Sequence, residues 1–312
     1  LRERRGLEDH GNTALEADSC DLLGVPGRTS AIQCLNCGSD LHGPFCASCG
    51  QRAVSAYPTI GQLVGDAWQE FSGWDGRFVR TFRVLLARPG ALTIETLEGR
   101  RARYVSPVRI YLIASLAYFL CASAIPNIRT PDAAVMPGSG VSIKMDGSGR
   151  VTGLTPENRE QALKDLERAP WWAQAILRPV LTDPEGFRAR FLQTLPRVLF
   201  VLVPVFAAIV ALFYRGRRFT QHLIFAVHLH AAVFITLIVR ELSQLVGSRI
   251  LLGLLELGSA LAIVVYSLVA FRRVYGESWT RVLAKAVGIG GLYSIAGLLA
   301  LLVTTAWATM GR

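Results

Sequence analysis

The chain has 312 residues, of which 51% are hydrophobic and only 18% charged, and its formal net charge is +10. Its mean hydropathy is +0.36, a positive value that argues against a wholly soluble protein despite this charge. The apolar residues are concentrated in long runs, whereas residues 1–106 and 127–195 are polar and charged.

A polar tail and a cysteine motif make up the first 53 residues. Residues 1–30 show no hydrophobic periodicity, and we predict that they form a disordered tail. In residues 31–53 the pattern Cys-x-x-Cys-Gly occurs twice, with eight residues between Cys37 and Cys46. In such a turn, backbone N–H groups point at the thiolate sulfurs and the glycine adopts a positive φ. We therefore predict a zinc ribbon with the ligands Cys34, Cys37, Cys46 and Cys49.

Three other interpretations of the cysteines stay open at this point: iron in place of zinc, two disulfides, or a dithiol redox centre. Zinc is favoured because paired turns with trailing glycines are more specific than a single Cys-x-x-Cys. Four sulfur ligands close the coordination shell, so we expect the ion to hold the fold together and not to activate water.

Residues 57–105 are predicted to form cytoplasmic amphipathic helices. In the first, over about residues 60–71, apolar side chains lie on one face. In the second, the apolar residues Phe78, Val79, Phe82, Leu85 and Leu86 lie on one side, opposite a basic face. The arginines of this basic face are Arg77, Arg80, Arg83 and Arg88.

A basic face opposite an aromatic and leucine face suits a helix in the headgroup layer of a membrane, with its arginines near anionic lipid. The alternative is that the two helices pack on each other as a small cytoplasmic bundle. Nucleic-acid binding is disfavoured, because the cysteine ribbon has no ladder of aromatic and basic residues.

Three short motifs follow the second helix. They are Arg88-Pro89-Gly90, Gly99-Arg100-Arg101-Ala102-Arg103-Tyr104 and Pro107-Val108-Arg109-Ile110-Tyr111. Their combination resembles a bacterial membrane-protein family catalogued as domain of unknown function 3667, whose members have an N-terminal cysteine ribbon and several spans. The resemblance runs from about Cys34 to Tyr118, with a weaker echo from His222 to His230, and Arg100 stands where lysine is common. It implies no reaction, since the family's activity is uncharacterised.

The second motif places Arg100, Arg101 and Arg103 just before the first long apolar run, where we expect them to meet lipid headgroups. Plain anchoring by positive charge is favoured over a specific site for a lipid phosphate or a partner's carboxylate.

Five apolar segments approach the roughly 20 residues that a helix needs to cross a bilayer. They lie near residues 107–126, 198–214, 220–239, 250–271 and 285–308. The predicted fold is mainly α: a polytopic helical membrane protein with about five spans, the zinc ribbon and amphipathic interfacial helices. Its predicted parts after residue 105 are span 1 at 106–126, an extracytoplasmic loop at 127–195, and a helical bundle of spans 2 to 5 at 196–312.

The predicted extracytoplasmic loop is expected to be partly helical. Its first part, Asn127 to Gly153, is rich in turn residues and is irregular or strand-like. Thr155-Pro156-Glu157 and Thr182-Asp183-Pro184 are typical helix starts, with proline at the first helical position.

Basic residues indicate the orientation, since short loops rich in arginine prefer the cytoplasm. Residues 100–103, 215–218 and 272–281 each hold three arginines, and all three clusters fall on one side of the predicted spans. This places the N-terminus in the cytoplasm and the C-terminus outside, and reducing conditions there favour metal binding over disulfides. The arginine-rich composition is typical of GC-rich bacteria, so the expected location is a bacterial inner membrane.

Ionisable residues inside apolar segments are costly, and they are therefore candidates for a functional site. Those in question are His222, His228, His230 and Glu256. At 100° and 1.5 Å per residue, the three histidines cannot share one ion without other helices, and Glu256 is the best available partner. Polar packing is the favoured interpretation, ahead of a proton or substrate pathway and of an intramembrane metal site.

Three classes of function fit these features. We favour a membrane-anchored interaction or regulatory module that contacts anionic headgroups and docks a cytoplasmic protein. The alternatives are a transporter or channel-like protein that uses the histidine-bearing third span, and an intramembrane enzyme acting on lipid. An enzyme lacks positive support because no catalytic motif is present. Glycines in the last apolar run would suit helix contacts or a homo-oligomer.

Overall fold

The computed structural model divides into two compact units, Leu1–Ala53 and Val54–Arg312. The described residues are 33–53, 59–61, 76–124, 134–135, 142–145, 151–152, 156–245 and 249–310. The predicted tail and nearly all of the first amphipathic helix lie outside them. In the first unit, two turns are flanked by single antiparallel bridges, Gln33 with Asp40 and Phe45 with Arg52.

The second unit is mainly helical, as predicted. Its helices are α2 (Arg77–Ala87), α3 (Ala91–Leu97), α4 (Pro107–Ala124), α5 (Pro156–Leu166), α6 (Trp171–Thr182), α7 (Pro184–Phe213), α8 (Phe219–Ser243), α9 (Arg249–Tyr275) and α10 (Trp279–Met310). Short strands β1 (Ala134–Val135), β2 (Ser142–Met145) and β3 (Val151–Thr152) form an antiparallel sheet in the order β1-β2-β3. The strand-like character expected for this region is thus present.

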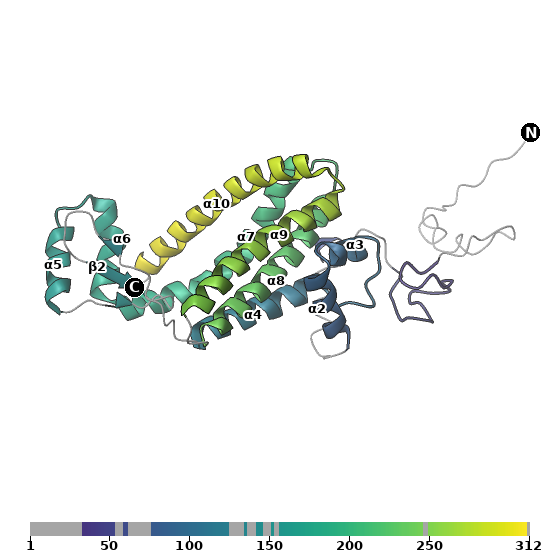
Figure 1. Ribbon diagram of the computed structural model, residues 1–312, viewed down its shortest axis with the longest axis horizontal. Coiled ribbons are helices and arrows are strands. Elements are labelled where there is room, and N and C mark those ends of the chain that lie inside the picture. Colours follow the sequence, from purple (N-terminus) through teal and green to yellow (C-terminus); the bar gives the residue numbers. More distant parts are fainter. Residues whose placement is uncertain are drawn as a thin grey trace, which may run out of the picture. The chain divides into compact units, whose positions relative to one another are not determined.

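Among the described residues, four helices are long and apolar enough to cross a membrane: α7, α8, α9 and α10. The counterpart of the predicted first span, α4, is a shorter apolar helix. These helices run alongside one another, with α2 and α3 at one end of the bundle and α5 and α6 at the other (Figure 1).

Helix α7 begins well before the predicted second span and runs unbroken through residues 195 and 196, where the sequence suggests a boundary. Its start is the predicted one: the Asp183 side chain accepts a hydrogen bond from the Gly186 N–H at 2.9 Å, and Pro184 is the first helical residue. A charged segment does not by itself end a helix, because arginine and glutamate have good helix propensity.

The centre of the bundle is α8, which packs against α4, α7 and α9. Phe225, Ala226 and Ala231 on α8 are almost fully buried. By contrast, α9 and α10 direct many large apolar side chains outward, among them Leu257 at 71% exposure and Val287 at 78%. Such exposed apolar faces are costly in water and suit contact with lipid.

Candidate functional site

The two cysteine turns of the first unit have the same backbone structure. In the first, the Cys34 N–H donates to the Ser39 carbonyl at 2.8 Å and the Gly38 N–H donates to the Cys34 carbonyl at 2.8 Å. The φ of Gly38 is 76°, a left-handed conformation that glycine adopts without strain, as the spacing predicts. The second turn repeats these features with Cys46, Gln51 and Gly50.

The four cysteine sulfurs form a compact group. Sγ of Cys34 lies 3.6 Å from Sγ of Cys49, and Sγ of Cys37 lies 3.5 Å from Sγ of Cys46. All four sulfurs lie within 4.8 Å of one another. A tetrahedral ion with bonds of about 2.3 Å needs sulfurs about 3.8 Å apart, so the group fits a tetrahedral metal centre.

The cysteine thiols of this group differ in acidity. Burial raises the pKa of Cys34 to about 11, because a thiolate is poorly solvated there. Hydrogen bonding to the Ser39 side chain and backbone lowers the pKa of the exposed Cys37 to about 6. At neutral pH a metal ion would therefore bind Cys37 as a thiolate, whereas its binding to the buried Cys34 would release a proton from the thiol.

The Arg-Pro-Gly turn between α2 and α3 is fastened to α9. Gly90 has a φ of 76°, and a Cβ at this position would lie 3.0 Å from the Ala270 carbonyl oxygen and 3.0 Å from Cγ2 of Val274. The Arg273 guanidinium donates a hydrogen bond to the Pro89 carbonyl at 2.8 Å. Glycine is thus needed both for its backbone angle and for the close approach of the two chain segments.

Helix α3 also reaches into the core of the bundle. Thr93, which is buried, is hydrogen-bonded to His228 through Oγ1 and Nδ1 at 3.1 Å. Next to it, the Tyr266 hydroxyl donates to the Leu85 carbonyl at 2.7 Å and so joins α9 to α2. The sequence motifs did not indicate that Thr93 has this role, because its partner lies 135 residues further along the chain.

Each of the three histidines of α8 has a different partner. Nδ1 of His222 is hydrogen-bonded to the Tyr275 hydroxyl at 2.8 Å, and Nε2 of His230 to the Tyr293 hydroxyl at 2.7 Å. The partner of His228 is Thr93. The four cysteines form the only His, Cys, Asp or Glu group in the described part of the chain that could hold a metal ion. The histidines and Glu256 are therefore not brought together as ion ligands.

Glu241 is a buried acidic residue that the sequence places in a short loop. It lies instead in the last turn of α8, where it pairs with Arg240 at 3.0 Å. The helix extends past the predicted end of the third span at residue 239, and this carries the pair into regular structure. A charge buried in this way needs such a partner.

The predicted headgroup arginines have different surroundings. Arg100 pairs with Glu95 at 2.6 Å and also with Glu98, and Nε of Arg101 donates to the Thr96 carbonyl at 3.3 Å. These two arginines thus contact the end of α3 and the turn that follows it. The others, except Arg77, line a common pocket.

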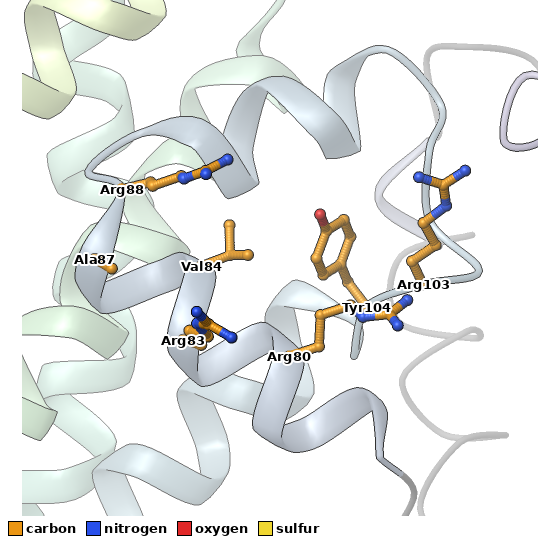
Figure 2. Close-up of a pocket in the computed structure, with 7 residues that line it drawn as sticks. All are labelled: Arg80, Arg83, Val84, Ala87, Arg88, Arg103 and Tyr104. Atoms are coloured by element: carbon orange, nitrogen blue, oxygen red, sulfur yellow. The ribbon is translucent and has the colours of Figure 1, made fainter.

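The pocket has a volume of about 640 Å³ and lies between α2 and the segment after α3 (Figure 2). The lining residues are Arg80, Arg83, Val84, Ala87, Arg88, Arg103 and Tyr104. On α2, Phe78 and Leu85 are buried in the bundle, whereas Val79 and Leu86 are exposed. The predicted apolar side of this helix is therefore divided between the protein core and the surface.

Together these features define a mainly helical, candidate multi-span membrane protein with a four-cysteine metal site. Residues 75–119 match the model of a family described as Protein of unknown function (DUF3667), which confirms the resemblance. The match covers α2, α3 and most of α4, and it does not include the cysteine unit. No curated protein and no solved structure matches the chain.

Proposed function

We propose that the protein is a membrane-anchored interaction module, in which a zinc-stabilised ribbon docks a protein partner in the cytoplasm. The observation that carries this proposal is the closed group of four sulfurs. Because sulfur fills every position of a tetrahedral ion, the metal has no place for a water or substrate and acts on the fold alone. Zinc is the ion that such a site ordinarily holds.

The surface of the ribbon supports a docking role. Leu35 and Phe45 are 47% and 61% exposed, although both are large and apolar. Leu35 lies inside the first Cys-x-x-Cys turn, and Phe45 directly precedes Cys46. A metal-held unit of this size has little core to bury them, and exposed aromatic and aliphatic side chains are typical anchors of protein interfaces.

The proposed orientation places the ribbon in the cytoplasm of a bacterial cell. Contacts support it: Arg273 binds the Arg-Pro-Gly turn, and Tyr214 at the end of α7 stacks on Tyr275 at 3.9 Å. The ends of α7 and α9 therefore lie at the same end of the bundle as α3. The three arginine clusters follow or precede these ends, as expected for a cytoplasmic face.

In this arrangement α4 is a fifth span, and the C-terminus is extracytoplasmic. The 18 residues of α4 give this helix a length of about 27 Å, close to the hydrocarbon thickness of a bilayer. A cysteine in place of Trp171 should react with an impermeant maleimide in intact cells, whereas one in place of Arg215 should react only after permeabilisation. The reverse pattern would invert the topology and place the ribbon outside.

The docking role is tested by photo-crosslinking in cells. A crosslinking amino acid in place of Phe45 should capture one defined protein in the cytoplasm, and the Cys34→Ser/Cys46→Ser variant should lose this product. The control position is Trp171, which is 80% exposed on a different unit of the chain. If position 45 yields only the products seen at position 171, the ribbon is not a docking site.

A transport role is the second candidate, favoured by two imidazole nitrogens. Nε2 of His222 and Nε2 of His228 are buried and have no hydrogen-bond partner within the described residues. Such atoms suit a polar path through a bundle. The space beside His228 is only about 10 Å³, room for about one water, which favours the packing role. A His228→Gln variant with impaired growth and an intact fold would support transport.

A further inference from the structure

The arginine pocket combines several positive charges with some apolar surface. Four of its seven lining residues are arginines, none is acidic, and Val84 and Ala87 supply apolar surface. Figure 2 shows that the arginines surround the space from both α2 and the segment after α3, with the Tyr104 ring between them. The volume of about 640 Å³ is in the usual range for small-molecule sites.

Three arginines of this pocket differ in ion pairing from Arg100 in the neighbouring motif. Arg100 is neutralised by Glu95 and Glu98, close to the pocket in the chain. By contrast, Arg80, Arg83 and Arg88 form no ion pair with any residue that the structure describes. Positive charges that line one pocket repel one another, and a bound anion would reduce this repulsion.

The lining indicates a particular anion. Guanidinium groups bind phosphate oxygens through paired, charge-assisted hydrogen bonds, and the Tyr104 hydroxyl can donate another. Several arginines favour the higher charge of a phosphate monoester over the single charge of a diester. The pocket is much larger than one phosphate group, so Val84 and Ala87 are available to a less polar part of the ligand.

The position of the pocket makes a lipid an accessible source of this group. All its lining residues lie within the segment 75–119, at the end of the bundle where the arginine clusters gather. In the proposed orientation this end lies at the cytoplasmic headgroups. A lipid source depends on that placement, but binding at the pocket does not depend on what the ribbon does.

We propose that the pocket lined by Arg80, Arg83, Arg88 and Arg103 is a binding site for a phosphate monoester. The monoester is the headgroup of an anionic lipid or a soluble phosphorylated molecule. Bound there, it bridges α2 to the segment after α3 and completes the charge balance of the motif region. Its binding site is distinct from the four-cysteine centre.

The test is native mass spectrometry of the full-length protein in detergent with added phosphatidic acid, phosphatidylglycerol or phosphatidylcholine. We expect preferential retention of phosphatidic acid, the monoester. In the Arg83→Gln/Arg88→Gln variant this affinity should fall about tenfold or more, because each lost charge-assisted contact contributes on the order of tenfold. The Arg83→Lys/Arg88→Lys variant should be intermediate, since lysine keeps the charge but not the planar fork.

The matched control is Arg215→Gln/Arg281→Gln, which removes the same charge from exposed arginines of two other basic clusters. It should retain phosphatidic acid within about twofold of the unaltered protein, as expected for surface charges outside a site. Equal weakening in both glutamine variants, or equal retention of phosphatidic acid and phosphatidylglycerol, would overturn the proposal. Helix content by circular dichroism confirms that each variant is folded.

A competition arm identifies the source of the phosphate. If glycerol 3-phosphate displaces phosphatidic acid at similar concentration, the site binds a soluble phosphate monoester. If it does not, the ligand of the site is the lipid. Metal content, measured on the same samples, separates this inference from the proposed function. A pocket variant that keeps its metal but no longer binds the lipid supports the proposed phosphate site. Loss of the metal without loss of lipid binding bears on the proposed ribbon and not on the pocket.

Discussion

Gly90 shows how one residue determines the approach of two segments. Its backbone is left-handed, and it lies so close to α9 that a Cβ would make a tight contact of 3.0 Å with the Ala270 carbonyl oxygen. Gly276 has a similar φ of 70°, but a Cβ there would meet nothing within 4 Å. Substitution of Gly276 therefore measures the free-energy cost of the left-handed backbone angle alone, whereas substitution of Gly90 adds the cost of the close contact.

Replacement of these glycines by alanine should have unequal effects. Gly276→Ala should lower the free energy of unfolding by roughly 1–2 kcal/mol, the cost of a left-handed alanine. Gly90→Ala should cost more, since its Cβ also meets the Ala270 carbonyl. Thermal unfolding in detergent measures both, and equal melting temperatures would show that the close approach does not matter.

Two cysteines of the ribbon should differ in reactivity once the metal is removed. After treatment with a chelator, a pH of 7 lies above the Cys37 pKa of about 6, so Cys37 is mainly thiolate. The same pH lies far below the Cys34 pKa of about 11, so Cys34 is mainly thiol. The thiolate is the reactive form, so iodoacetamide should modify Cys37 first. Its rate should fall as the pH drops through 6, as read by peptide mass spectrometry. Faster modification of Cys34 would contradict this order.

At the scale of elements, the contact between α3 and α8 depends on a buried polar pair. The Thr93→Val substitution keeps the shape but leaves Nδ1 of His228 without its hydroxyl partner. Leaving a buried polar group unsatisfied costs about 1–3 kcal/mol, so thermal stability in detergent should fall. Thr93→Ser keeps the hydroxyl and should be milder. If serine is as harmful as valine, the hydrogen bond is not what matters.

The helices illustrate which features can be read from sequence. The 3.6-residue period of α2 and the apolar length of α8 are local properties, and they predicted both helices. Whether an apolar side chain faces the core or the surface depends on neighbours far along the chain. Phe78 and Val79, for example, are adjacent apolar residues in α2, but Phe78 is buried and Val79 is exposed. The continuous course of α7 was missed because charge distribution says little about where a helix ends.

The same distinction applies to the candidate sites. The cluster of four cysteines could be predicted because its members come from two short copies of one local turn. The partners of the histidines could not, since Thr93, Tyr275 and Tyr293 come from α3, α9 and α10. The arginine pocket needed the structure as well, because Arg103 joins the arginines of α2 only after the chain has turned back at Gly90.

On the scale of the whole molecule, the chain combines a unit with a candidate metal site and a bundle whose outer helices are apolar. In the proposed function the two parts are stabilised by different means: sulfur ligands to a metal ion in the first, and helix packing around α8 in the second. Loss of the metal should therefore destabilise the ribbon while the bundle keeps its helices. This independence allows the metal centre to be measured in the full-length protein.

Elemental analysis of the protein purified in detergent is the most direct test. We predict about one zinc ion per chain, no zinc in the Cys34→Ser/Cys46→Ser variant, and an unchanged helix signal from the bundle in both. A metal-free protein whose four cysteines are paired as two disulfides, as shown by its mass before and after reduction, would contradict a zinc-held ribbon.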